Sequence, residues 1–170
     1  MALDELLPRL ERRTAYDHSH RRRCMVRRLG RITGPEKGAL VPDFPGIHHA
    51  ALTVADLDRS VPWYRRLFGS DPVIDEDTGP FRHVVWLVGG TLLGLHQFPG
   101  GSSGEGFDEH QVGLDHISFG CANRDELDTW QGHLDELGVT HGGIVDASYG
   151  SGLSFRDPDN LALEFFAPAG

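Results

Sequence analysis

Four residues able to bind a metal ion recur at matched places in the two halves of this 170-residue chain. His49 aligns with His116 at an offset of 67 residues, and the residues around them align at the same offset. Near an offset of 68, the segment around His96 aligns with the segment around Glu164. A fixed offset indicates that one structural unit was used twice. Each half therefore opens and closes with a potential ligand.

The alternation of side chains along a strand decides which of these residues face together. His49 faces one side of its expected strand and His48 must face the other, because only residues two apart share a face. His96 shares its face with Gly94, and Glu164 likewise shares its face with the small residue Ala162, which leaves room beside each ligand. If the two units pack about a pseudo-twofold axis, the four ligand positions converge on one site.

Imidazole and carboxylate groups together suit Fe(II), Mn(II), Zn(II), Ni(II) or Co(II), and two His with one carboxylate leave coordination positions open. A single His in a strand is more often a hydrogen-bonded structural residue. Glu164, however, lies in an apolar stretch and is costly to bury unless it is paired or bound to a metal. The predicted metal ligands are His49, His116, Glu164 and His96.

The elements that must position these ligands follow the order β-α-β-β-β in each half, which predicts an α+β fold. Apolar runs, capping residues and turn residues define the elements. In the first half we expect strands at 47–54, 72–76, 81–88 and 91–98, and a helix from Asp56 to about Phe68. In the second half we expect strands at 114–121, 142–146, 152–156 and 161–167, and a helix at 124–137.

Charge divides the chain near residue 44. Residues 1–40 hold ten of the 16 Lys and Arg with five acids, whereas the remaining 130 residues hold six Arg and twenty acids. We expect residues 1–44 to form a basic extension, partly helical or mobile, and residues 45–170 to form the domain. Its first module spans about 46–99, a linker 99–111, and the second module about 112–168. So acidic a domain would repel nucleic acid.

The composition predicts a cytoplasmic protein. The longest apolar run, residues 84–95, is too short to cross a membrane, and the N-terminus lacks the pattern of a signal peptide. With only Cys24 and Cys121, neither a disulfide framework nor a cysteine zinc site is indicated.

Three motifs stand out along the chain. They are Ile47-His48-His49-Ala50-Ala51-Leu52-Thr53-Val54-Ala55-Asp56-Leu57-Asp58-Arg59-Ser60, then Leu114-Asp115-His116, then Asp157-Pro158-Asp159-Asn160 through Leu163-Glu164-Phe165. Taken together, they resemble the vicinal oxygen chelate superfamily, which includes glyoxalase I, extradiol dioxygenases, fosfomycin resistance enzymes, methylmalonyl-CoA epimerase and bleomycin-binding proteins. The resemblance covers about residues 45–168.

The resemblance implies two βαβββ modules that form an open, barrel-like sheet cleft holding a divalent metal (Fe2+, Mn2+, Zn2+ or Ni2+), and commonly a homodimer. By position, His49 matches the ligand of the first strand, His116 that of the fifth strand and Glu164 that of the last strand. His96 is a departure, because glyoxalase-like members usually have Glu or Gln there.

Further residues are candidates for the surroundings of the metal. His83 and Tyr149 are predicted to supply acid-base or hydrogen-bond chemistry, a role that His and Tyr play in ring-cleaving members. A surface His and a Tyr at the edge of the core are the ordinary alternatives. The aromatic residues predicted to line a substrate pocket, for which core packing is an equal explanation, are Trp86, Phe98, Phe155 and Phe166.

The favoured function is a divalent-metal-dependent enzyme of the glyoxalase and dioxygenase type. It would chelate two neighbouring oxygens of a small organic molecule and act as a dioxygenase or as a lyase or isomerase. The alternative is a non-catalytic protein that binds an antibiotic or metabolite, as bleomycin-resistance proteins do. A third possibility, an interaction adaptor, rests on the basic N-terminal segment alone.

Overall fold

The computed structural model describes residues 45–101 and 106–170. The described residues all belong to one compact unit, residues 41–170. The basic extension expected at residues 1–44 lies outside the described residues.

The described part contains two modules with the same order of elements, as the sequence predicts. The first consists of β1 (His49–Thr53), α2 (Leu57–Phe68), β2 (Ile74–Asp77), β3 (Arg82–Val88) and β4 (Thr91–Gln97). The second consists of β5 (Ile117–Gly120), α3 (Arg124–Glu136), β6 (His141–Ala147), β7 (Gly150–Arg156) and β8 (Ala162–Pro168). The predicted α+β class with two βαβββ modules is confirmed.

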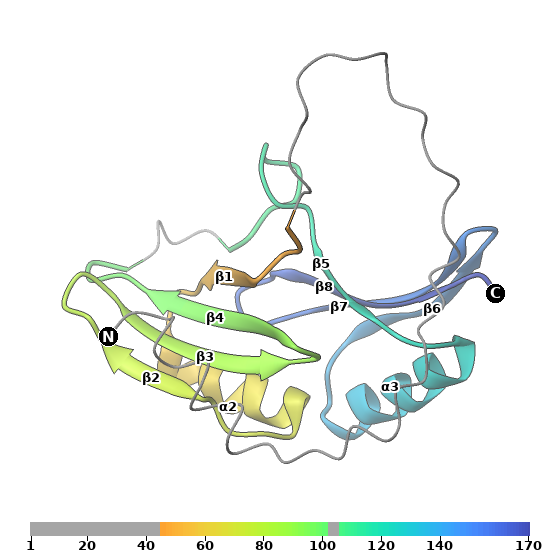
Figure 1. Ribbon diagram of the computed structural model, residues 1–170, viewed down its shortest axis with the longest axis horizontal. Coiled ribbons are helices and arrows are strands. Elements are labelled where there is room, and N and C mark those ends of the chain that lie inside the picture. The colour runs from red at the N-terminus through yellow and green to blue at the C-terminus, as the bar shows by residue number, and fades with distance from the viewer. Residues whose placement is uncertain (1–44, 102–105) are drawn as a thin grey trace. The chain divides into compact units, whose positions relative to one another are not determined.

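Each module folds into its own four-stranded sheet (Figure 1). The strand order is β1-β4-β3-β2 in the first sheet and β5-β8-β7-β6 in the second. The opening strand of each module pairs in parallel with the last strand, and the other pairs are antiparallel. The first and last strands of each module are therefore neighbours. The predicted ligands lie in these strands, except His116, which lies immediately before β5. The two sheets do not close into one barrel.

Local chemistry fixes the helices. Asp56 caps α2 by accepting the amide N–H of Asp58, and Gly69 ends it with a positive φ of 61°. Asn123 caps α3 by accepting the amide N–H of Glu126. Pro62 lies within α2 without ending it, contrary to its usual effect inside a helix.

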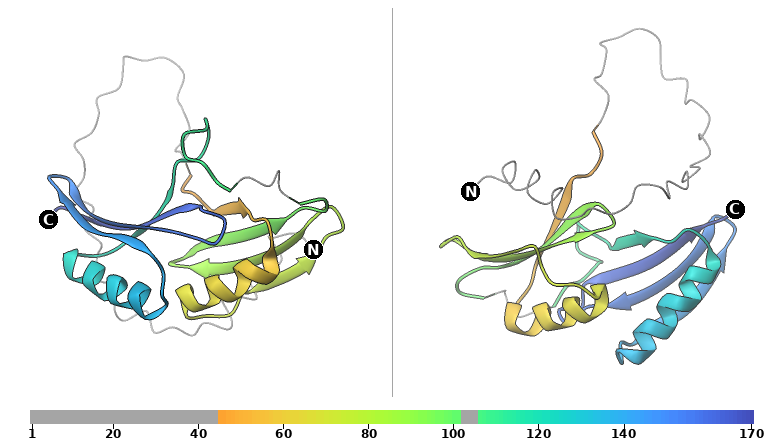
Figure 2. Two further views of the ribbon diagram at one scale, coloured as in Figure 1. Left: turned by 180° about the vertical axis from the view of Figure 1, so that it is seen from behind. Right: turned by 60° about the horizontal axis from the view of Figure 1, so that its bottom comes forward.

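Each helix packs on one face of its own sheet (Figure 2). The core side of β1 is marked by buried Leu52, and that of β4 by Leu93 and Leu95. Trp63 and Trp130 are half-buried against this core, as expected for helix residues that pack on a sheet. The opposite face of each sheet stays accessible, and His49 lies on it.

The connection between β7 and β8 joins the two modules. Asp157 accepts a hydrogen bond from the hydroxyl of Tyr64 in α2 (3.0 Å), and Asp159 accepts the amide N–H of Ala55 (3.1 Å). Asp159 also forms an ion pair with Arg59. The turn predicted at residues 157–160 thus anchors the second module to the first helix. Within the described residues, no helix is both long and apolar enough to cross a membrane.

Candidate metal centre

The second sheet brings two of the predicted ligands together. Glu164 lies on the accessible face of β8, and its neighbour on β5 is Ser118, two residues after His116. The Nε2 atom of His116 lies 3.7 Å from the Oε2 atom of Glu164. An imidazole nitrogen and a carboxylate oxygen at this separation form a pair that a divalent cation can bridge.

A second carboxylate orients the imidazole ring of His116. Asp115 Oδ1 lies 2.5 Å from His116 Nδ1, so Nδ1 carries the proton when the ring is neutral. The unprotonated Nε2, a good metal ligand, then faces Glu164. Histidines that bind metals commonly have such a carboxylate on the other ring nitrogen.

The small residues of β7 leave space for the Glu164 side chain. A Cβ atom at Gly152 would lie only 2.5 Å from Glu164 Oε1. The carboxylate therefore lies across the β7 backbone, in the space that any larger residue would fill. Ser154, the register partner of Glu164, is the next β7 residue on this face. The cradle around Glu164 and the nitrogen–oxygen donor set fit a divalent metal.

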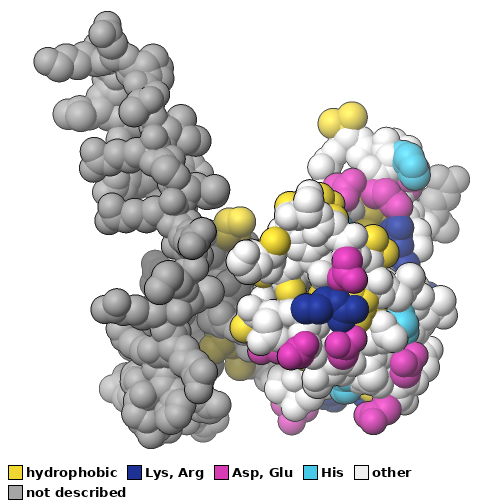
Figure 3. Space-filling model, turned by 90° about the vertical axis from the view of Figure 1, so that its right-hand side faces the viewer, with side chains coloured by type: hydrophobic (Ala, Val, Ile, Leu, Met, Phe, Trp, Pro, Cys, Tyr) yellow, Lys and Arg dark blue, Asp and Glu magenta, His cyan; other side chains and the backbone are white. Residues whose placement is uncertain are grey.

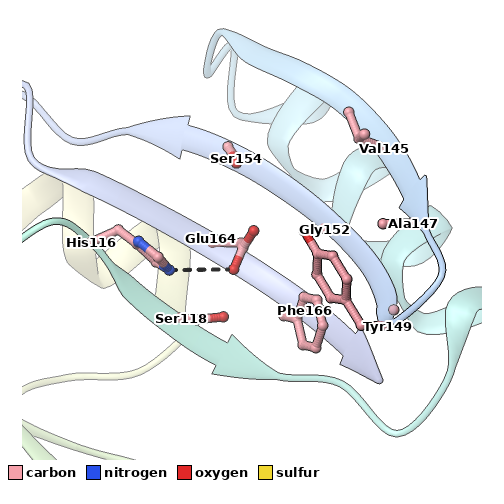
Figure 4. A pocket seen from close by; sticks show the side chains of 10 residues that line it. His116, Ser118, Val145, Ala147, Tyr149, Gly152, Ser154, Glu164 and Phe166 are labelled. Carbon is pink, nitrogen blue, oxygen red and sulfur yellow. Dashed lines mark ion pairs between the residues drawn. The ribbon is translucent and has the colours of Figure 1, made fainter. Parts of the chain in front are cut away.

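The pair lies in a hollow of about 610 Å³ on the second sheet (Figure 4). His116 and Glu164 point toward each other at one end, and the rings of Tyr149 and Phe166 lie together at the other. The lining residues are His116, Ser118, Val145, Ala147, Tyr149, Gly150, Gly152, Ser154, Glu164 and Phe166.

The first sheet carries a cluster of histidines instead. The His96 ring stacks on Phe81, with centroids 4.6 Å apart, and contacts His83 on the neighbouring strand. Burial lowers the pKa of His96 from its ordinary value, and the nearby His83 and His49 lower it further. His83 Nε2 is buried without a hydrogen-bond partner and lies 3.7 Å from a carboxylate oxygen of Glu76.

His49 lies on the first sheet, with its Nδ1 atom 3.1 Å from Nδ1 of His48. The two adjacent rings touch, although strand alternation would send them to opposite faces. His48 lies just outside β1, which begins at His49, so the alternation of side chains along a strand does not apply to His48. Their contact is edge to face, with ring centroids 5.4 Å apart.

The strand register corrects the alignment of the two halves. Ala51 pairs with Gly94 in the first sheet, whereas the equivalent of Ala51 in the second, Ser118, pairs with Glu164. Gly94, rather than His96, therefore occupies the place that Glu164 has. The offset of 68 residues misaligned the last strands by two positions. The role of His96 as a metal ligand stays a prediction.

The described chain does not gather the four predicted ligands into one cluster. In residues 45–101 and 106–170, three ligand-type side chains lie within 4.8 Å of one another only at Asp108, Glu109 and His110. That group is a largely exposed loop in which Asp108 already accepts hydrogen bonds from His110 and Gln111. The pair in the second sheet and the histidines of the first remain separate in the single chain.

The other predicted site residues are divided between the hollow, the first sheet and the core. Tyr149 and Phe166 line the hollow. Phe98 is 44% exposed and lies beside Phe81 in the first module. Trp86 and Phe155 are buried in the core, so their predicted contact with a substrate has no support in this structure.

Sequence reasoning missed several residues of the site. Asp115 could have been found, because it precedes His116 and carboxylates often orient metal-binding histidines. Gly152 could not, because its contact with Glu164 depends on the register between β7 and β8. Ser118 and Val145 are ordinary strand residues, one polar and one apolar, and nothing in the sequence marks either of them as part of a site.

The family is shown by comparison with known proteins. Residues 46–165 match the sequence profile of the Glyoxalase/Bleomycin resistance protein/Dioxygenase superfamily. The chain belongs to this superfamily, as the three motifs predict.

Among individual relatives, the chain is 29% identical over 128 residues to the metallothiol transferase FosB of Shouchella clausii (strain KSM-K16), covering 70% of this chain and 77% of FosB. A glyoxylase/bleomycin resistance protein/dioxygenase domain from Frankia sp. EAN1pec is 31% identical, with a TM-score of 0.68 and coverage of 74% and 93%. The fosfomycin resistance protein FosX of Listeria monocytogenes shares the fold, with 21% identity, a TM-score of 0.60 and coverage of 74% and 93%. One FosX mutant was crystallised with Mn(II) and 1S,2S-dihydroxypropylphosphonic acid.

Proposed function

We propose that this protein is a divalent-metal-dependent enzyme that binds a small organic molecule through two neighbouring oxygen atoms. The observation that carries this proposal is the His116–Glu164 pair, 3.7 Å apart and lying in an open hollow. Asp115 on the far nitrogen of His116 and Gly152 beneath Glu164 support it, because both hold the donor atoms in place. The similarity of the chain to the metallothiol transferase FosB also supports a metal-dependent reaction.

His116 and Glu164 would hold the metal together with His49, and His96 is a further candidate. A bound Fe2+, Mn2+, Zn2+ or Ni2+ would act as a Lewis acid toward the substrate oxygens. The single chain does not bring His49 to the pair, so we propose a homodimer in which the first sheet of a second copy offers this ligand.

The remaining residues would bind and orient the substrate. Asp115 orients the His116 ring so that Nε2 faces Glu164, and Ser118 and Ser154 offer hydroxyl groups to substrate oxygens. Tyr149 lines the hollow and is positioned to exchange a proton with a bound molecule. His83, on the first sheet, is a candidate for the same task if that sheet closes the site.

Metal titration tests the proposal. Metal-free protein is titrated calorimetrically with Mn2+, Zn2+, Ni2+ and, without oxygen, Fe2+. We expect one metal ion per chain and an affinity that falls by on the order of 100-fold or more in Glu164→Gln, which removes the charge and keeps the shape. Asp108→Asn is the matched control, because it alters the exposed ligand-type cluster instead.

Two results would contradict the proposal. The first is no binding of any of the four ions, which would favour the non-catalytic binding protein. The second is binding that survives Glu164→Gln and disappears in Asp108→Asn, which would place the metal on the exposed loop.

A further inference from the structure

The end of the hollow away from His116 is an exposed aromatic wall. The rings of Tyr149 and Phe166 stack with centroids 6.2 Å apart and an interplanar angle of 21° (Figure 4). Tyr149 is 73% exposed, and Val145 beside it on β6 is 67% exposed. Apolar side chains that stay open to solvent next to a polar pair are typical of a ligand-contacting surface.

The backbone of β7 holds this wall in its orientation. A Cβ atom at Gly150 would overlap the ring of Phe166, so the ring lies across the strand where a larger residue would stand. Gly152 makes the same allowance for Glu164 one position further along the face. Two glycines of one strand therefore make room for the ring at one end of the hollow and for the carboxylate at the other.

Among the described residues, none of the side chains that line the hollow is Lys or Arg, so this lining brings no positive charge. Residues 45–170 contain six arginines and no lysine, and five of these arginines already pair with carboxylates. The sixth, Arg66, lies in the last turn of α2. On the face drawn in Figure 3, the Lys and Arg side chains likewise lie beside Asp and Glu. The paired arginines are Arg59, Arg65, Arg82, Arg124 and Arg156.

We infer that the hollow takes a flat, ring-bearing substrate without a separate anionic group, and that it discriminates against phosphonates. This inference rests on the proposed function, because the substrate oxygens are taken to reach the metal at His116 and Glu164. The rest of the molecule then lies against Tyr149, Phe166 and Val145. A ring gains stacking there, whereas a phosphonate dianion would lose water and meet only neutral side chains and the Glu164 carboxylate.

Three probes separate the ring from the charge. Benzohydroxamate and acetohydroxamate bind metals through the same two neighbouring oxygens and differ only in the ring. 4-Phosphonobenzohydroxamate keeps both the chelating group and the ring and adds a separate dianion. Each is titrated calorimetrically into the Zn2+-loaded full-length protein. We expect benzohydroxamate to bind about 10-fold more tightly than acetohydroxamate, as stacking on an aromatic wall allows. The phosphono derivative should bind at least about 10-fold more weakly than benzohydroxamate.

Variants assign these preferences to the wall. Tyr149→Ala should reduce the ring preference to about 2-fold, while Tyr149→Phe keeps it. Val112→Ala, at an exposed loop position, should leave it unchanged. Val145→Arg adds the missing cation and should raise the affinity for 4-phosphonobenzohydroxamate by about 10-fold.

Equal binding of benzohydroxamate and acetohydroxamate, or binding of 4-phosphonobenzohydroxamate as tight as that of benzohydroxamate, would overturn the inference and leave the metal site intact. Failure of the proposed function appears separately, as no Zn2+ binding before any probe is added. In that case the inference falls with the proposed function, because the probes have no metal to chelate.

Discussion

The two sheets have the same topology, but different types of residue occupy their equivalent positions. In the second sheet, Glu164 occupies the register position beside the opening strand, and the glycine on the neighbouring strand gives it space. In the first sheet that position is Gly94, and the His96 ring leans over it, with Nε2 3.5 Å from where a Cβ would be.

The difference shows how a duplicated unit became asymmetric. The second sheet provides two donor atoms that face each other across 3.7 Å, one of them oriented by Asp115. The first sheet packs its histidines against an aromatic ring, and His49 is the one that holds the place equivalent to His116. We therefore expect two ligands from the second module and one from the first.

The sharpest test of this asymmetry compares two histidines of the first sheet. His49→Ala should weaken metal binding by on the order of 100-fold, because it removes a donor atom that no other residue of the site supplies. His96→Ala should weaken metal binding by less than about 5-fold, because the His96 ring, stacked on Phe81, would lie near the metal without donating an atom to it. Calorimetric titration of both variants with Zn2+ measures the difference. A loss in His96→Ala as large as that in His49→Ala would establish a four-ligand site and restore the symmetry.

A smaller effect is expected from adding one methyl group to each sheet. Gly152→Ala should lower metal affinity by about 10-fold, because its Cβ would displace the Glu164 carboxylate. Gly94→Ala should change it by less than about 2-fold, because 3.5 Å from His96 is an ordinary contact.

Thermal melting of the metal-free proteins separates placement of the ligand from general damage to the sheet. The double variant Gly152→Ala with Glu164→Asp, whose shorter side chain avoids the clash, should recover part of the affinity. Equal losses in the two glycine variants would show that the sheets hold their ligands alike.

Much of this arrangement follows from the sequence, and the exceptions have physical causes. Element order and helix ends were predicted because apolar period and capping residues are local signals. His83 and Trp86 are three residues apart on one strand, so strand alternation places them on opposite faces of the sheet. Because His83 was expected on the face of the metal site, the burial of Trp86 on the other face could have been foreseen. The register between strands could not, since it depends on pairing between distant segments. That is why the role of Gly152 was missed and His96 was aligned with Glu164.

The connections before the last strands differ as well, and the effect expected there is on stability. β3 and β4 are joined through Gly89 and Gly90, whereas the turn before β8 carries Asp157, which accepts the Tyr64 hydroxyl. Tyr64→Phe keeps the packing and removes this bond. It should lower the free energy of unfolding by about 1–3 kcal/mol at pH 7, measured by urea denaturation. Tyr149→Phe, at an exposed position, should leave it unchanged.

The pH dependence identifies the carboxylate as the cause. Burial raises the pKa of Asp157 although the hydrogen bonds from Leu161 and Tyr64 favour its ionised form. A folded-state pKa above the unfolded value means that this group stabilises the fold most at low pH, and that the benefit is lost as pH rises through the folded pKa. Without the Tyr64 hydroxyl the loss is greater, so the deficit of Tyr64→Phe should be larger at pH 7 than near pH 4. A deficit that is the same at both pH values would mean that the anchor between the modules depends on packing and not on the ionisation of Asp157.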